Sequence, residues 1–517
     1  MTPADAQVNK FRKSSQTWYK LTAETCARAE HHHPTFMSDD QGPVKRMLSI
    51  IVLLQFVLWC NAEETDLFVY PSILQERSAE GKLVLRLNDK ITLNLEKSSV
   101  LADKLLFVTS SEKMNQLEAV DTTAIQKTIY HDTHYQSSVI VREREGTTQV
   151  EGIVSNNLRI KPVPTGERSL QGQMLHKIYE VKETDERFAN LEPRLESSYR
   201  GDSEYGGSRR GRRNGDGGDG DVFIVELHVL SDRAHQRDFD TNEDLIGYIA
   251  VMTNAVNLRY LDMAEPKVRF QLVGLTRRTE PPFAKNIQGT IDTGVTLDGI
   301  LKYHEDDKIP GEPDVVFLVT GLDLIKVDHG RVEKGIAGRA FVGAVCSKHG
   351  VGVGEDKATA YSGVNTMAHE LGHIMGSDHD TTPRCPWSEG YLMSYVDGGL
   401  KKYRLSPCTE DSIRKVYGRL TKACKRLLTS TNLMENHKEY PGQTVREKYY
   451  CKKVVGGKGK GLKVFPMKPV DEAKKCKMHC CYWKGNMRTC WGATILEGMA
   501  CMKGKTCKRG ACGVHEW

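Results

Sequence analysis

The chain has 517 residues, enough for about three to four domains. Hydrophobic residues make up 39% and charged residues 27% of it, a globular balance that excludes a largely disordered chain, and the net charge is +6. The 14 cysteines are unevenly spread, since none lies between Cys60 and Cys346 and nine lie from Cys424 to Cys512. This clustering predicts a disulfide-stapled C-terminal module, which needs an oxidising compartment.

An apolar run at 47–59 (MLSIIVLLQFVLW) follows Lys45 and Arg46 and precedes the small residue Ala62. These flanks predict a signal peptide at 47–62. A helix over the run would rise only about 20 Å, short of the roughly 30 Å hydrocarbon layer, which argues against a transmembrane helix. We interpret residues 1–46 as a leader that is not part of the native protein. No later stretch is apolar enough to span a bilayer, so the sequence predicts a secreted, extracellular product with no membrane span.

Residues 63–213 are interpreted as a β-rich propeptide. Alternating leucines and isoleucines on either side of Asn88-Asp89-Lys90 predict a hairpin. A linker rich in Ser, Gly, Arg and Asp follows at 196–221, and it contains Arg209-Arg210-Gly211-Arg212-Arg213. Exposed loops concentrate proteolysis, so we expect processing after Arg213. The alternative is a solvated charge run or a patch for polyanions.

Residues 214–428 have a mixed α/β pattern. We expect strands at 222–230, 267–275 and 314–320 and a possible glycine-rich edge strand within 345–353. Apolar residues at helical spacing, Leu245, Ile249, Met252 and Val256, predict the first helix. Two more helices are expected at 359–375, ended by Gly376, and at about 410–428.

The decisive segment is His369-Glu370-Leu371-Gly372-His373-Ile374-Met375-Gly376-Ser377-Asp378-His379. Residues four apart lie on one helix face, so His369 and His373 can hold one zinc ion at about 2.0–2.1 Å. Gly376 can adopt positive φ and turn the chain so that His379 supplies the third ligand. Three protein ligands leave a fourth position for water, which is the pattern of a catalytic zinc site. Glu370 lies beside the first ligand and is expected to act as the general base.

The alternative is that these are three surface or core histidines that bind no metal. It is disfavoured because five positions fit the longer HExxHxxGxxH pattern. The segment resembles the zinc motif of the metzincins, and Asp380 directly after the third histidine resembles their reprolysin (adamalysin) branch. The resemblance implies a twisted mixed sheet over helices, with Met393 as a structural support beneath the zinc. Plain core packing would also explain a methionine there, and both interpretations can hold.

Two features depart from the reprolysin pattern. Tyr395 stands where astacin-like metzincins carry a zinc-proximal tyrosine, so it is a possible fifth ligand or oxyanion donor, with plain packing as the alternative. Residues 63–213 contain no cysteine that could silence the zinc, so latency is expected to be steric or absent. The resemblance implies disulfides Cys346–Cys424 and Cys385–Cys408, while sequence alone leaves connectivity open. A structural calcium is common in the family, but we find no ligand set for it in this sequence.

The tail at 429–517 is expected to be a basic, cysteine-rich domain. Residues 425–517 hold 20 Lys/Arg and 7 Asp/Glu, a local charge of 20 − 7 = +13. Disulfides are favoured over a zinc knuckle because two cysteines, Cys480 and Cys481, are adjacent. This positive charge is explained equally well by binding to heparan sulfate or matrix and by a basic surface that is only solvated. Nucleic acid is not expected as a partner, because the chain is predicted to be secreted.

The layout most resembles the secreted salivary metalloproteases of ticks. By that resemblance we expect a zinc-dependent endopeptidase acting on extracellular proteins, with fibrin(ogen) and matrix among the substrates. Two alternatives stay open. The first alternative is a narrow processing peptidase for peptide mediators. The second is a protein that acts mainly as a binder through its basic tail. The presence of Glu370 argues against the binder, because binding needs no general base.

Overall fold

The computed structural model describes residues 66–75, 82–110, 115–144, 146–181, 222–278, 289–328, 331–427, 446–456, 461–496, 498–508 and 510–514. The predicted leader, the signal peptide and the basic cluster ending at Arg213 lie outside these ranges. Of the helices within them, none has both the length and the apolarity that crossing a bilayer demands.

Most N-terminal strands form one nine-stranded sheet, whose neighbouring strands all pair antiparallel. The predicted hairpin is confirmed, because Leu83 pairs with Leu95 and Leu85 with Leu93. In sheet order the strands are β1 (Leu67–Val69), β11 (His176–Glu180), β10 (Leu158–Pro162), β9 (Thr147–Ile153), β8 (Ser137–Arg144), β7 (Ile129–Asp132), β4 (Thr92–Lys97), β3 (Leu83–Arg86) and β2 (Ser72–Gln75).

A second, seven-stranded sheet lies mainly in residues 222–427, called the catalytic region below because they contain the predicted zinc motif. Its order is β18 (Gly338–Ala340), β19 (Val351–Glu355), β15 (Val315–Thr320), β12 (Val222–Ser231), β13 (Lys267–Arg278), β5 (Leu101–Ser110) and β6 (Asn115–Asp121). The inner strands run parallel, and β18 and β6 are antiparallel to their neighbours. All of β15 and nearly all of β12 are buried, as expected for parallel strands covered on both faces.

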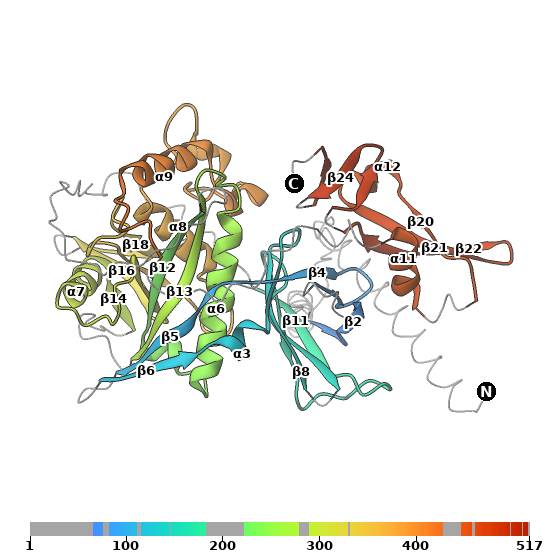
Figure 1. The fold of residues 1–517 in the computed structure, drawn as a ribbon, viewed down its shortest axis with the longest axis horizontal. Helices are drawn as coiled ribbons and strands as arrows, with labels where there is room; N and C mark the ends of the chain where they lie inside the picture. The colour runs from blue at the N-terminus through green and yellow to red at the C-terminus, as the bar shows by residue number, and fades with distance from the viewer. Residues whose placement is uncertain are drawn as a thin grey trace, which may run out of the picture. The chain divides into compact units, whose positions relative to one another are not determined.

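Two strands of this sheet come from the predicted propeptide. β5 pairs in parallel with β13, and β6 forms the edge beyond it (Figure 1). Pattern alone predicts a strand but not its partner, so this arrangement could not be read from the sequence. A separate three-stranded sheet contains β14 (Thr290–Asp292), β16 (Asp323–Asp328) and β17 (Arg331–Ile336).

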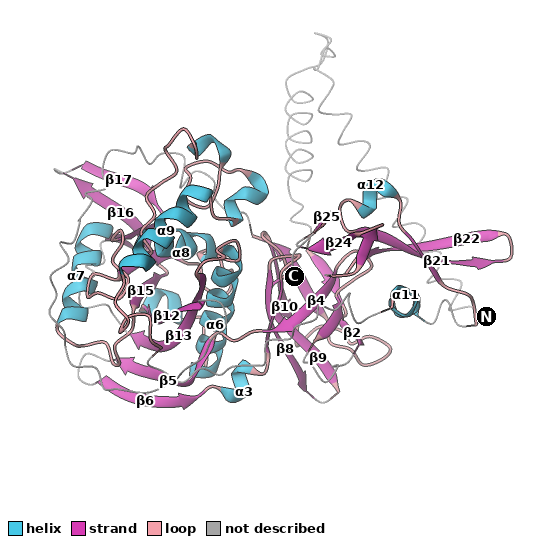
Figure 2. Cartoon of the chain, turned by 45° about the horizontal axis from the view of Figure 1, so that its top comes forward, coloured by secondary structure: helices cyan, strands magenta, loops and turns pink. Residues whose placement is uncertain are grey.

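The longer helices of the catalytic region are α6 (Asn242–Arg259), α7 (Thr293–Glu305), α8 (Val364–Ile374) and α9 (Pro407–Arg419). Short elements are α3 (Thr123–Gln126), α5 (Arg233–Gln236), η2 (Trp387–Glu389) and η3 (Gly399–Tyr403). Helices and strands alternate along this region, whereas the N-terminal sheet is formed almost wholly of strands (Figure 2). Thr241 caps α6 by accepting a hydrogen bond from the Asp244 backbone N–H.

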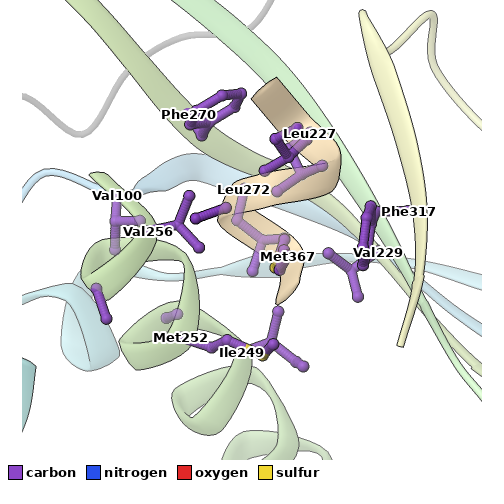
Figure 3. Packing of buried hydrophobic residues seen from close by; sticks show 14 of the residues in the cluster. Val100, Leu227, Val229, Ile249, Met252, Val256, Phe270, Leu272, Phe317 and Met367 are labelled. Atoms are coloured by element: carbon purple, nitrogen blue, oxygen red, sulfur yellow. The ribbon is translucent and has the colours of Figure 1, made fainter. Parts of the chain in front are cut away.

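The core lies between α6, α8 and the seven-stranded sheet. Side chains of α6 such as Met252 and Val256 meet Leu227 and Phe270 of the sheet and Met367 of α8 (Figure 3). The predicted apolar face of α6 is therefore confirmed, but the helix is buried nearly all round from Leu245 onward.

The predicted edge position of one strand and the predicted bounds of two helices were wrong. The glycine-rich strand β19 is not at the edge, because β18 pairs with its outer side. The zinc helix begins at Val364 rather than at 359, since Thr359 and Tyr361 have φ of 68° and 52°, which no α-helix accommodates. The last helix begins at Pro407, where Ser406 accepts a hydrogen bond from Thr409 N–H, and ends at Arg419 because the next residue is extended.

The C-terminal residues form a small module with its own buried cluster. Its elements are α11 (Glu447–Val455), α12 (Val470–Ala473), β20 (Phe465–Met467), β21 (Lys477–Lys484), β22 (Met487–Thr494), β23 (Ala500–Met502), β24 (Lys505–Lys508) and β25 (Ala511–Gly513). The predicted disulfides are present as Cys451–Cys480, Cys476–Cys507, Cys481–Cys490 and Cys501–Cys512. These bridges stabilise a module that is too short to form a large hydrophobic core.

Candidate metal centre

The helix α8 and the turn after it bring three imidazoles together. His369 and His373 lie one turn apart and are buried, at 6% and 3% exposure. Gly376 has φ of 106°, and a Cβ there would lie 2.2 Å from Val416 Cγ2. Glycine is therefore required both for the backbone angle and for space. The turn returns the chain so that His379 faces the two helical histidines.

The spacing of the three histidines fits a zinc ion. Their ligand nitrogens all lie within 4.8 Å of one another, and His369 Nε2 is 3.0 Å from His379 Nε2. Two nitrogens bound tetrahedrally at about 2.0–2.1 Å must lie about 3.3 Å apart, close to that distance. The predicted ligands are thus assembled into one site whose donors suit zinc.

Each imidazole is oriented by a partner on its other nitrogen. His369 Nδ1 lies 2.7 Å from Leu392 O, and His373 Nδ1 lies 2.7 Å from Ser377 O. Carbonyl oxygens only accept, so both Nδ1 atoms carry the proton, and Nε2 of each ring presents the lone pair that a metal binds.

Burial also keeps these rings neutral. It lowers the pKa of His369 to about 3, with His373 adding to the effect, and lowers the pKa of His373 to about 4. The pKa of His379 is lowered by burial first and by the other two histidines second. Neutral imidazole is the form that binds zinc.

Met393 and Asp380 are joined to the zinc helix and to one another by packing and hydrogen bonds. Met393 is fully buried, and a Cβ on Gly372 would meet its sulfur at 2.6 Å, so the helix can approach the methionine only because residue 372 is glycine. The Asp380 backbone N–H donates to Met393 O at 2.8 Å, and Ser406 Oγ donates to Asp380 Oδ1 at 2.6 Å. These bonds tie the residue after His379 to Met393 and to Ser406, the residue that caps α9.

Glu370 lies directly against the edge strand β18. Its side chain is 6% exposed, and a Cβ on Gly338 would meet Glu370 Cγ and Oε1 at 2.8 Å each. Gly338 therefore leaves the space that the glutamate occupies. Sequence reasoning missed this residue, because a glycine in a three-residue strand carries no signal of what it faces.

Tyr395 contacts a ligand. Its hydroxyl is 2.6 Å from His379 Nδ1, and the two rings lie 4.3 Å apart between centroids. The hydroxyl is therefore placed as the outer partner of the third histidine, in the position that carbonyl oxygens take for the other two.

The catalytic region contains two disulfides, Cys346–Cys424 and Cys385–Cys408, the pairs that the family resemblance implies. Asp314 lies close to the first pair, but both sulfurs are consumed in the bridge, so this cluster offers no metal site. The first bridge closes a loop across the sequence that contains the whole zinc motif. Among the described residues, no third set of three candidate ligands accompanies these two groups.

Comparison with known proteins agrees with this centre. Residues 246–380 match the family described as "Metallo-peptidase family M12B Reprolysin-like". The chain is 27% identical over 385 residues to the venom metalloproteinase antarease TserMP_A of Tityus serrulatus, covering 69% of this chain and 92% of that protein. It is 26% identical to the venom metalloproteinase BumaMPs1 of Olivierus martensii, covering 68% and 90%.

Among solved structures, metalloproteinase-II from Bacteroides fragilis matches over 70% of this chain and 94% of that one, with 11% identity and a TM-score of 0.32. The family match spans α6 to the third histidine, and its activity is the one for which the three histidines are arranged. Residues 246–380 therefore form a reprolysin-like metallopeptidase region, and the protein is a zinc metalloendopeptidase, whose reaction is the hydrolysis of peptide bonds within protein chains.

Proposed function

We propose that this metalloprotease is secreted, has the metzincin fold and cleaves extracellular proteins, with Glu370 as its general base. The observation that carries the proposal is the placement of Glu370 on the same helix as two zinc ligands and against the edge strand β18. An extended substrate can add to such an edge through backbone hydrogen bonds. The scissile bond would then lie beside both the glutamate and the histidines.

The roles of the residues follow from this placement. His369, His373 and His379 hold the ion, and zinc, when bound, acidifies a water and polarises the scissile carbonyl. Glu370 takes the proton of the attacking water and delivers it to the departing amine nitrogen. Tyr395 orients His379 through its hydroxyl. Residues 393–399 would form part of the wall that selects the substrate side chain.

The remaining expectations extend this proposal to the whole chain. We propose that 47–62 directs secretion, that 63–213 is a propeptide cleaved after Arg213, and that 429–517 binds heparan sulfate or matrix. The names of the venom relatives support an extracellular role. By the resemblance to the tick enzymes, fibrin(ogen) and matrix stay the predicted substrates.

The test compares the full, processed protein with Glu370→Gln on a mixed extracellular proteome, with and without a chelator. The amide keeps the shape of the carboxylate but is not a base, so we expect zinc content to be unchanged and cleavage to fall about 10²–10⁴-fold. Glu333→Gln, on the exposed strand β17, is the matched control and should cleave normally.

Three outcomes separate the alternatives. Cleavage that persists in Glu370→Gln removes the proposed base. A very short list of cleaved proteins identifies the narrow processing peptidase instead. A biological effect that survives in the variant although cleavage is lost identifies the binder.

A further inference from the structure

The N-terminal segment, residues 66–181, is built into the catalytic sheet. β5 pairs with β13 from Leu101↔Leu272 to Ser110↔Arg278, with one irregularity after Leu272. The Leu272 N–H also donates to Val100 O at 2.8 Å. Without β5, the twelve-residue strand β13 would become an exposed edge with unpaired backbone groups.

The same segment covers the outer side of α6. Ser138 Oγ donates to Val251 O at 2.9 Å, and Asn254 Nδ2 donates to Ser138 Oγ at 2.9 Å. A Cβ on Gly247 would lie 3.0 Å from Ile140 Cδ1, so β8 packs tightly on the helix. A helix that is buried all round needs protein on both sides, and here the N-terminal segment supplies one of them.

The segment also shares a hydrophobic core with the zinc helix. Val100 and Phe107 belong to the same buried cluster as Met367 and Leu371 of α8. Figure 3 shows Val100 beside Val256 of α6, close to the group that includes Met367. Burying such a core is the main source of folding free energy, so its two halves depend on one another.

The loop that leads into the zinc helix is held by the same segment. Arg159, on β10 and only 2% exposed, donates from Nε to Ala360 O at 2.8 Å and from Nη2 to Tyr361 O at 3.2 Å. Tyr179 Oη donates to Thr359 O at 2.8 Å. Both Thr359 and Tyr361 have positive φ, a conformation that persists only where surrounding contacts impose it.

On the other side, the segment contacts the C-terminal module. Arg86 Nη1 donates to Val454 O at 3.1 Å, and the hydroxyls of Tyr135 and Thr494 lie 2.9 Å apart. Val84 belongs to the buried cluster of that module.

We propose that residues 66–181 stay bound to the catalytic region after any cleavage between residues 182 and 221, as a noncovalent subunit that the zinc helix requires. The interaction is a paired strand, a covered helix and a shared core, which are the contacts of one domain interior rather than of a cover that dissociates. The proposal concerns association and zinc retention, so it stands or falls separately from the identity of the substrate.

The experiment uses the full chain with a recognition sequence for a specific protease inserted between residues 182 and 221. After cleavage, the two fragments should elute together from a sizing column under native conditions, with the zinc content unchanged. Separation by denaturant should release the zinc in the same transition. Fragments that part under native conditions, with the one beginning near residue 222 keeping its zinc and its thermal stability, would overturn the proposal.

Two paired variants test whether Arg159 holds the loop at 359–361 that leads into α8. Arg159→Met removes the donors to residues 360 and 361, whereas Lys104→Met removes an equal charge at an exposed position of β5. Hydrogen exchange at 356–363 should accelerate about tenfold or more in the first variant and stay unchanged in the second. Equal exchange in both refutes the role of Arg159. Tyr179→Phe, which removes only the hydroxyl, provides the same test if Arg159→Met does not fold.

Discussion

Replacing Gly376 with alanine tests whether the turn after α8 delivers His379 to the other two histidines. At φ of 106° an alanine is strained, which costs about 1–3 kcal/mol. Its Cβ would also lie 2.2 Å from Val416 Cγ2, and overpacking of this kind costs about 1–3 kcal/mol. The sum is roughly 2–6 kcal/mol.

A loss of this size is measurable by two readouts. For a region of about 200 residues, 1 kcal/mol corresponds to about 2–4 °C, so Tm should fall by at least about 4 °C. If the backbone instead relaxes to relieve the strain, His379 moves and the protein should lose zinc to a weaker chelator than the wild type does. Thermal unfolding and metal analysis after dialysis against graded chelators measure both effects.

Two companion variants show which cost dominates. Gly418→Ala lies in α9 with nothing within 4 Å of its new Cβ, so it should leave Tm unchanged or raise it slightly. Val416→Ala combined with Gly376→Ala removes the clash but keeps the backbone strain, so it should recover only part of the loss. If Gly376→Ala keeps the wild-type Tm and binds zinc normally, the turn is not what positions His379.

Three further results are expected. Gly338→Ala should displace Glu370, which a Cβ would meet at 2.8 Å, and should lower kcat while zinc content is kept; normal kcat would show that the edge strand does not constrain the base. Tyr395→Phe should lower zinc affinity about 10–100-fold through His379, read by chelator competition, and an unchanged affinity would reduce the tyrosine to packing. Chelation should lower Tm, because zinc binds the folded state, and readdition of zinc should restore it; a Tm indifferent to the metal would contradict a resident ion.

Local features were predictable from the amino-acid sequence. The four-residue spacing of His369 and His373, the break at Gly376 and the hairpin around residues 83–95 all depend on neighbours a few positions away. Helical spacing and the freedom of glycine are properties of short segments, so they can be recognised without knowing the rest of the fold. The clustered C-terminal cysteines likewise predicted disulfides but not which cysteines would pair.

Only the tertiary structure decided what these segments meet. Gly338 over Glu370, Tyr395 against His379, and β5 in the catalytic sheet join residues 16 to more than 150 positions apart. The zinc helix begins later than its pattern suggests, because Arg159 and Tyr179, which are distant in sequence, donate hydrogen bonds to the loop at 359–361. The positive φ angles of that loop are not favoured by any local preference. Amino-acid patterns record which face of an element is apolar, but the partner of that face is chosen by the packing of the whole chain.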